Sequence, residues 1–355
     1  MKKTILFLSL LIFTLSNCSS EKQVKKIDDN GKKTQLNEND KKNQKTDPVK
    51  FEFEIDFGKN KKMYFKSKWA KTSQMPLKVN AFGIAQKNQK VYLLGGYGTS
   101  GLSNRFYEYD LISKKWTRLK DMPRQKSSFS AAIFQNKLYS IGGFGKSGPL
   151  KEVDIYDFDK KEWKNGPILK NPRYQHKSIV FQNRLYVVGG LKSKNSVIYL
   201  NIGAEKWQKG PDLNTNRDSH DLAFIDNQIV VIGGKKFGSG LTSVEALKKS
   251  SNHWIILGQI PTSIFGFVSL PYKKNIIIIG GFKDISARGF LNSVTLYLIY
   301  QKKIFKAVPL PIGLANFGAV LYKDSIYLFG GRSLTGLSDS VLKMDMKYES
   351  SSDTR

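Results

Sequence analysis

One stretch of the chain shows the unit from which most of it is built: residues 128–163 read SFSAAIFQNKLYSIGGFGKSGPLKEVDIYDFDKKEW. Two runs, Ser128–Phe134 and Lys137–Ile141, flank a two-residue Gln-Asn turn, which is the pattern of a β-hairpin. The second run ends at a Gly-Gly pair, where the lack of Cβ atoms allows a tight exit. Two further runs, Glu152–Asp157 and Glu162–Ile168, complete four expected strands.

This unit recurs six times, with Gly-Gly pairs 44 to 50 residues apart and an aromatic residue 25 or 26 residues before each pair. The glycines are Gly95 and Gly96, Gly142 and Gly143, Gly189 and Gly190, Gly233 and Gly234, Gly280 and Gly281, and Gly330 and Gly331. The aromatic residues are Trp69, Trp116, Trp163, Trp207, Trp254 and Phe305. A repeat of this length predicts an all-β fold, a six-bladed β-propeller with four strands per blade. We expect each Trp to pack blade against blade.

The frame of the repeat also predicts how the ring closes. After the last Gly-Gly pair, Val341–Met346 matches the third strand of the unit, but no fourth strand follows it. A strand-like segment carrying Trp69 stands before the first complete unit instead. We therefore expect this N-terminal strand to complete the last blade. Phe51–Phe57, which alternates apolar and acidic residues, is a candidate for a further edge strand.

These features resemble the kelch-repeat family: a strand, a turn, an apolar run ending in Gly-Gly, a Tyr-Asp strand such as Tyr156-Asp157, and a Trp. The resemblance covers residues 62–346 and implies a ligand site on the face that carries the loops after each Gly-Gly pair. The nearest enzymes in the family are the periplasmic kelch sialic-acid mutarotases. Copper-radical oxidases of this fold need a Cys-Tyr crosslink within the domain, and the single cysteine, Cys18, lies outside it.

The N-terminus has the pattern of an export signal. Lys2 and Lys3 precede the apolar run Ile5–Leu15, which is too short to cross a hydrocarbon core of about 30 Å. Cys18 follows the run, a position that resembles a bacterial lipobox and implies lipidation of this cysteine. The alternative is an ordinary secretory signal with an incidental cysteine. We expect a lipid-anchored protein of the bacterial cell envelope, at the outer membrane, on its periplasmic side or at the cell surface.

The expected domains follow from composition. Residues 1–17 are the signal peptide, residues 18–50 a flexible tether without aromatic residues, residues 51–348 the propeller, and residues 349–355 a C-terminal tail. The chain carries 58 Lys and Arg against 29 Asp and Glu, a net charge of +29. This excess favours anionic partners, although exposed lysines without any partner would produce the same number.

The candidate ligand-binding residues are Arg173, His176, Arg217, His220, Arg288 and Arg332. Arg173 with His176 and Arg217 with His220 both follow the pattern Arg-x-x-His, at the same distance before a Gly-Gly pair. Phe occupies the place of the His in the other four units, which favours packing over catalysis for His176 and His220. Arg173 and Arg217 precede the strand, so we expect them to be freer to meet a ligand, and a guanidinium suits carboxylate, phosphate or sulfate groups.

No nucleophile-His-acid spacing, phosphate-binding loop, zinc motif or carboxylate pair stands out, and neither a metal nor a cofactor is expected. We expect a monomer that binds a protein or an acidic glycan through the loop face, and no nucleic acid. The alternative is an isomerase or mutarotase acting on an acidic sugar. A buried carboxylate beside Arg173 and Arg217 at the channel mouth would favour the enzyme, and a shallow basic or aromatic face would favour the binding protein.

Overall fold

The computed structural model describes residues 61–64, 68–249, 251–284, 286 and 289–350. The chain divides into two units, residues 1–49 and 50–355, and the first lies outside the described residues. Cys18 and the expected tether lie outside the described residues, and so does the candidate edge strand Phe51–Phe57 at the start of the second unit. The propeller belongs to the second unit.

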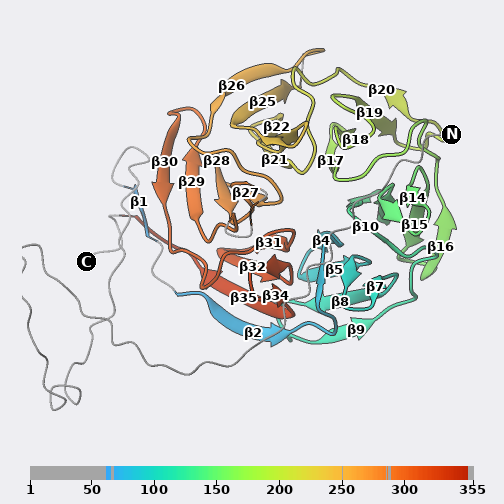
Figure 1. Cartoon of the computed structure of the whole chain (residues 1–355), viewed down its shortest axis with the longest axis horizontal. Coiled ribbons are helices and arrows are strands. Elements are labelled where there is room, and N and C mark those ends of the chain that lie inside the picture. The colour runs from blue at the N-terminus through green and yellow to red at the C-terminus, as the bar shows by residue number, and fades with distance from the viewer. Residues whose placement is uncertain (1–60, 65–67, 250, 285, 287–288, 351–355) are drawn as a thin grey trace, which may run out of the picture. The chain divides into compact units, whose positions relative to one another are not determined.

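The described residues form six four-stranded antiparallel sheets, the blades, which surround a common centre (Figure 1). The first three blades are β4 (Gly83–Lys87), β5 (Lys90–Leu94), β8 (Phe106–Asp110) and β9 (Trp116–Arg118); β11 (Ser130–Phe134), β12 (Lys137–Ile141), β15 (Val153–Asp157) and β16 (Glu162–Asn165); and β17 (Lys177–Phe181), β18 (Arg184–Val188), β19 (Val197–Asn201) and β20 (Gln208–Lys209). The last three are β21 (Asp221–Ile225), β22 (Gln228–Ile232), β25 (Ser243–Lys248) and β26 (Ile255–Gln259); β27 (Val268–Tyr272), β28 (Asn275–Ile279), β29 (Val294–Leu298) and β30 (Lys303–Lys306); and β31 (Gly318–Tyr322), β32 (Ser325–Phe329), β35 (Ser340–Asp345) and β2 (Ala70–Gln74). The all-β propeller predicted from the repeat is confirmed.

Short two-residue strands accompany the loops. They are β3 (Val79–Asn80), β6 (Tyr97–Gly98), β7 (Gly101–Leu102), β10 (Lys126–Ser127), β13 (Phe144–Gly145), β14 (Gly148–Pro149), β23 (Lys235–Lys236), β24 (Ser239–Gly240), β33 (Arg332–Ser333) and β34 (Gly336–Leu337). All of them lie next to the Gly-Gly pairs or the starts of the innermost strands, on what we call the loop face. The opposite turn face carries the two-residue hairpin turns, such as Gln182-Asn183.

The ring closes as the repeat predicts. Strand β2, from the N-terminal side of the domain, pairs with β35 in the last blade, with Lys71 opposite Leu342. Trp69 lies one residue before β2, and its indole Nε1 donates to the carbonyl of Val308 (3.1 Å). A further pair that the repeat did not predict, β1 (Lys61–Tyr64) with β36 (Lys347–Ser350), joins the same two chain segments and runs past the expected start of the tail.

A closed ring of hydrogen bonds surrounds the centre of the propeller on the loop face. Six residues, each two positions before the innermost strand of its blade, have φ between 51° and 61°. They are Ala81, Ser128, Gln175, Ser219, Gly266 and Asn316. The backbone N–H of each donates to the carbonyl of its equivalent in the preceding blade, at 2.7 to 2.9 Å, and Ala81 donates to Asn316 to complete the circle. We call these six residues the central ring.

The Gly-Gly pairs join neighbouring blades. The N–H of Gly143 donates to the carbonyl of Arg173, which belongs to the next blade (2.9 Å). A Cβ added to Gly142, where φ is +55°, would lie 2.6 Å from that same carbonyl oxygen. Glycine is therefore required here by the close approach of the next blade as well as by the backbone conformation.

The Trp residues join the blades at their outer strands. The indole Nε1 donates to a carbonyl of the preceding blade from Trp163 to Lys120 (2.7 Å), from Trp207 to Pro167 (2.7 Å) and from Trp254 to Pro211 (2.8 Å). The Nε1 of Trp116, which lies beside the closing blade, is buried and has no partner among the described residues. The structure confirms that these residues pack blade against blade.

Candidate ligand site in the central channel

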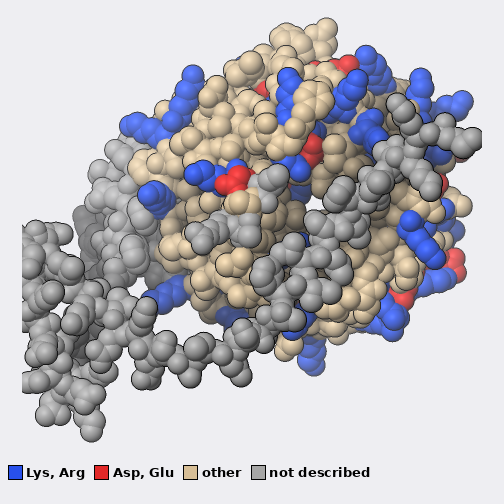
Figure 2. All heavy atoms as spheres, in the orientation of Figure 1, with Lys and Arg blue, Asp and Glu red and all other residues tan. Residues whose placement is uncertain are grey.

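Positive charge is sparse in the lining of the central cavity. Figure 2 shows Lys and Arg scattered over the face in view, most of them toward its edge. The lining of the cavity at the centre contains no Asp, Glu or Arg and a single Lys, Lys177. The cavity lining itself therefore carries little positive charge.

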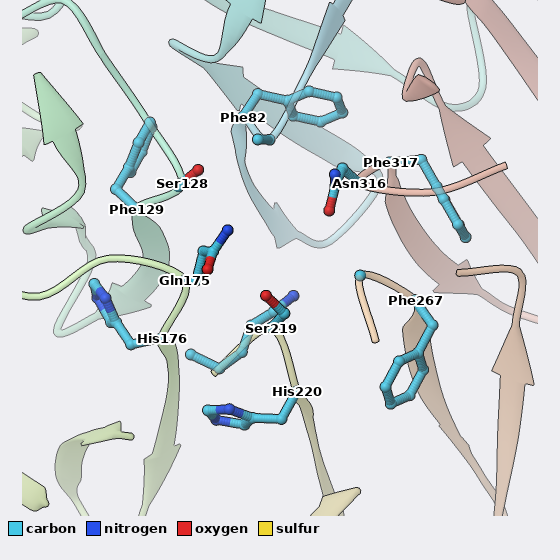
Figure 3. A pocket seen from close by; sticks show the side chains of 13 residues that line it. Phe82, Ser128, Phe129, Gln175, His176, Ser219, His220, Phe267, Asn316 and Phe317 are labelled. Carbon is cyan, nitrogen blue, oxygen red and sulfur yellow. The ribbon is translucent and has the colours of Figure 1, made fainter. Parts of the chain in front are cut away.

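This central cavity has a volume of about 100 Å³ and lies where the innermost strands begin. Its first layer is the central ring, all of whose members are half-buried. Figure 3 shows the side chains of Ser128, Gln175, Ser219 and Asn316 around the central space, with Phe and His rings set behind them. The cavity thus presents hydroxyl and amide groups, and it has room for a few waters or for one end group of a larger ligand.

The second layer consists of large rings: Phe82, Phe129, His176, His220, Phe267 and Phe317. All of these rings except Phe82 pack against the first glycine of the preceding blade's Gly-Gly pair. A Cβ on Gly189 would lie 2.9 Å from Cε1 of His220, and one on Gly95 would lie 2.8 Å from Phe129. The packing that the four Phe indicate for His176 and His220 is what the structure shows.

Both histidines are held neutral. They are only 2 % and 1 % exposed, and burial, reinforced by the charge of the nearby Arg173 and Arg217, lowers the pKa of His176 and His220 well below 6.5. None of their ring nitrogens has a hydrogen-bond partner among the described residues, and neither has the buried Oε1 of Gln175. These atoms are buried behind the cavity wall, so they are not exposed to a ligand in the cavity.

The charged residue of the cavity, Lys177, is neutralised within the fold. Its Nζ lies 2.9 Å from Oδ1 of Asp221 on the next blade's inner strand. The other oxygen of Asp221 accepts from the backbone N–H (2.5 Å) and the hydroxyl (3.1 Å) of Ser269, one blade further on. This chain of contacts ties three inner strands together, so Lys177 contributes little net charge to the cavity.

The expectation that Arg173 and Arg217 are accessible on the loop face is wrong, because they are only 3 % and 2 % exposed. Their guanidinium groups point into their own blades, where each donates to two backbone carbonyls. Arg217 also contacts the buried carboxylate of Glu245. Arg173 has no such carboxylate, and burial lowers its pKa to about 10. Neither arginine lines the central cavity.

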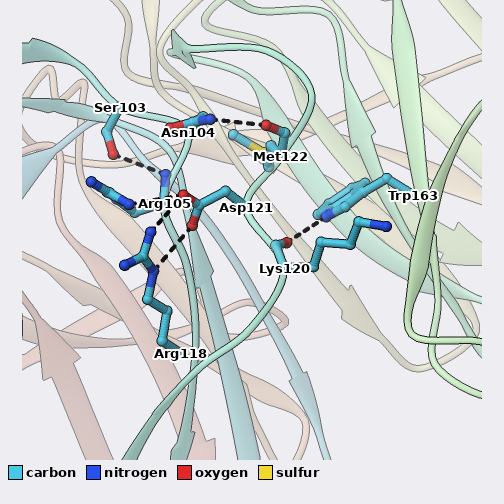
Figure 4. Close-up of polar contacts among 8 residues, drawn as sticks. All are labelled: Ser103, Asn104, Arg105, Arg118, Lys120, Asp121, Met122 and Trp163. Carbon is cyan, nitrogen blue, oxygen red and sulfur yellow. Dashed lines mark hydrogen bonds and ion pairs between the residues drawn. The ribbon is translucent and has the colours of Figure 1, made fainter.

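Arg332, a third arginine candidate, does not line the cavity either. Arg332 is exposed and bridges Ala315 through the backbone on the loop face. Arg288 lies outside the described residues. Other loop cations are engaged within the fold. Arg105 pairs with Asp121 (2.9 Å), which also accepts from Arg118 (2.8 Å), as Figure 4 shows.

Aromatic residues stand next to the central ring on the loop face. The residue before each member of the central ring forms a backbone β-pair with the residue after a Gly-Gly pair. The pairs are Asn80 with Tyr97, Ser127 with Phe144, Tyr174 with Leu191, Asp218 with Lys235, Phe265 with Phe282, and Ala315 with Arg332. Tyr97 is 52 % and Phe144 39 % exposed. Phe144 meets Tyr174 edge to face (5.3 Å), and Phe265 stacks on Phe282 (5.4 Å).

Sequence reasoning missed this aromatic mouth. The signal was available one residue beyond three of the six Gly-Gly pairs, where Tyr97, Phe144 and Phe282 stand. One acid lies among these residues: Asp218 is buried, its carboxylate accepts from the hydroxyl of Ser219 (2.9 Å) and lies 3.6 Å from Nζ of Lys235, and burial raises its pKa. The mouth is therefore aromatic with one buried carboxylate.

Among the described residues no group of three His, Cys, Asp or Glu side chains is placed to hold a metal ion. In the same part of the chain, no helix has the length and apolar character needed to cross a membrane.

Comparison with known proteins agrees with this architecture. A family model of the KLHDC2/KLHL20/DRC7 Kelch-repeats domain matches residues 43–234, and a Kelch motif model matches residues 217–259. No curated protein matches the sequence. The solved structure of YjhT is similar, with a TM-score of 0.67 at 18 % identity over 78 % of this chain and 99 % of that one, which shows a shared fold alone. Since the Kelch-repeats model spans more than half of the sequence, this chain belongs to the kelch-repeat family.

Proposed function

We propose that this kelch propeller is a binding protein that holds the end group of a glycan in its central cavity. The observation that carries the proposal is the lining of neutral hydroxyl and amide side chains in the central ring: Ser128, Gln175, Ser219 and Asn316. Such groups donate and accept hydrogen bonds without charge, as sugar hydroxyls require.

The aromatic mouth supports the same ligand class. Tyr97 and Phe144 expose ring surface beside the cavity, and aromatic rings bury large apolar areas with little loss of conformational freedom. The apolar face of a sugar ring would lie on such a surface while its hydroxyls reach the central ring. A cavity of about 100 Å³ accepts one end group, so the remainder of the glycan would rest on the mouth.

The setting of this activity is proposed from the sequence. Lipidation at Cys18 would hold the protein at the bacterial envelope. Residues 19–50 have the composition of a flexible tether, which would let the propeller reach its ligand. The protein would act as a monomer. Exposed loop cations such as Lys146, Lys192, Lys236 and Arg332 would attract an acidic glycan over the distance allowed by salt screening.

The test is calorimetric titration of the purified protein with a panel of neutral and acidic mono- and oligosaccharides. For any saccharide that binds, Gln175→Ala and Phe144→Ala should each weaken binding about fivefold to a hundredfold, as expected for losing a hydrogen bond or an aromatic contact. Ile112→Ala, which removes a side chain 65 % exposed in the turn after β8, serves as the matched control and should leave binding unchanged. Failure of every saccharide, or equal effects of all three changes, would reject the proposal.

A sugar isomerase is the second candidate, because the mouth contains a buried carboxylate with a raised pKa, that of Asp218. A carboxyl group adjusted toward neutral pH can serve as a general acid or base. If the protein turns over a bound sugar, Asp218→Asn should abolish turnover and leave binding of the same sugar within a few-fold. Interconversion of sugar anomers followed by NMR distinguishes this enzyme from a binding protein.

A further inference from the structure

A second cavity, of about 310 Å³, lies between the third and fourth blades and away from the central channel. One wall comes from the β17–β18 hairpin and strand β19, and the other from the end of β25 and the turn that follows it. Arg184, which lines the cavity, begins β18, whereas Gly189 follows the far end of that strand. The cavity therefore reaches the turn face, and Gln182 spans it by donating from Nε2 to the carbonyl of Lys249 (2.7 Å).

The charged side chains that line this groove are all positive. Four cations line it and no Asp or Glu does. They are Arg184, Lys209, Lys248 and Lys249. Lys209 lies 3.3 Å from Asp212, but among the described residues no carboxylate lies within 4.0 Å of the other three.

The guanidinium of Arg184 is held in place. It lies over the ring of Tyr199, 4.7 Å from its centroid, and its Nε donates to Oδ1 of Asn201 (3.0 Å). Tyr199 and the buried Tyr186 also line the groove. A guanidinium fixed by stacking and by one hydrogen bond loses little freedom when it binds a further group.

The other blades provide an internal comparison. At the position of Arg184 the first blade has Lys90, which pairs with Glu108 (2.7 Å), and the second has Lys137, which pairs with Asp157 (3.9 Å). In the third blade the residue opposite Arg184 is Asn201 instead of an acid.

In the fourth blade the same opposite position is taken by Lys248. At this opposite position the first two blades carry an acid, Asp110 and Asp157, whereas the two blades that enclose the groove carry Asn201 and Lys248.

We propose that the groove between the third and fourth blades binds the phosphate group of a small molecule or of a lipid headgroup, with Arg184 as its anchor. A guanidinium fork matches two phosphate oxygens, Lys248 and Lys249 add charge at the turn, and the two tyrosine hydroxyls are further donors. The volume of about 310 Å³ exceeds what a bare phosphate needs, so the group that carries the phosphate also fits. This site does not depend on the proposed glycan site.

Calorimetric titration of the purified full chain tests this with two probes, inorganic phosphate and glycerol 3-phosphate, the latter standing for a lipid headgroup. We expect saturable binding of at least one probe, and preference for glycerol 3-phosphate would indicate the lipid source. Arg184→Gln should weaken binding about tenfold or more, and Arg184→Lys less, because it keeps the charge and loses the fork.

The matched control is Lys90→Gln, which removes the cation at the same position of the first blade and should change binding less than about twofold. If Arg184→Gln does not fold, the double change Lys248→Gln with Lys249→Gln, at two exposed positions, takes its place and should weaken binding to a similar extent. Absence of saturable binding of both probes up to about 20 mM, or an equal effect of Lys90→Gln, would overturn the proposal.

Discussion

Arg173 in the third blade and Arg217 in the fourth occupy the same position of the repeat, but only Arg217 has a buried carboxylate beside it. The carbonyls of both accept from the second glycine of the preceding blade. The guanidinium of Arg217 reaches Glu245, whereas that of Arg173 finds two carbonyls at 3.3 Å. The residue of the third blade that corresponds to Glu245 is Ile198.

A comparison of all six blades explains why both arrangements occur. The same carbonyl position is filled by Val79, Lys126, Arg173, Arg217, Ile264 and Leu314, all of them buried. Lys126 follows the pattern of Arg217, because its Nζ lies 3.1 Å from the buried carboxylate of Asp154. The position therefore accepts either an aliphatic side chain or a cation with its acid. Arg173 is the exception, a buried cation without an acid, and the two arginines should respond to substitution in opposite directions.

The largest effect is expected at the paired arginine. Arg217→Leu should destabilise the fold by about 3–5 kcal/mol, because it leaves the carboxylate of Glu245 buried with a single described donor, the N–H of Asn214. Urea unfolding measures the difference in the free energy of unfolding. The double change Arg217→Leu with Glu245→Leu should recover most of the loss, since it replaces the pair by apolar side chains. A loss in the double variant as large as in the single one would refute the pairing argument.

An intermediate effect concerns the histidines of the same two blades. Their pKa values in the folded protein are lowered well below 6.5, so in acid the unfolded chain binds protons that the folded chain does not. Stability is therefore fully present above about pH 6.5 and lost as the pH falls below it. The folded protein should therefore be less stable at pH 5 than at pH 7.

Phenylalanine provides the matched replacement, because Phe82, Phe129, Phe267 and Phe317 hold the same position in the other blades. The double change His176→Phe with His220→Phe should reduce the difference in stability between pH 7 and pH 5. Urea unfolding at the two pH values measures it. An unchanged pH dependence in this variant would show that other groups are responsible.

The propeller was predictable because its determinants are local and recur. The Gly-Gly pairs and the Trp residues mark places where backbone approach and blade contact admit few residue types, so they repeat visibly in the sequence. The closing strand after Trp69 followed from counting units. The central ring was not predictable in this way. Its members share a backbone conformation and a hydrogen bond but no residue type, as Gln175 and Gly266 illustrate.

The candidate site was predicted less well, for a physical reason. Arg173 and Arg217 lie in connections between strands, where a charged residue ordinarily faces water. Their burial depends on partners that lie far along the chain, such as Glu245, 28 residues after Arg217. Lys126 and Asp154 have the same spacing. A cation and an acid at this interval in two units was the signal that could have revealed an internal pair.

The smallest effect, and the one that decides the comparison, is expected for Arg173→Leu. The lowering of the pKa of Arg173 to about 10 corresponds to a cost of about 3 kcal/mol for keeping the charge buried. Against this, Leu loses the two long hydrogen bonds to Gly189 and Ser196, each worth about 1 kcal/mol. The variant should therefore be more stable than the wild type by about 1 kcal/mol, with Leu314 as the precedent in the sixth blade. Urea unfolding beside Arg217→Leu checks the sign, and a loss of several kcal/mol would mean that Arg173 has a partner as important as Glu245.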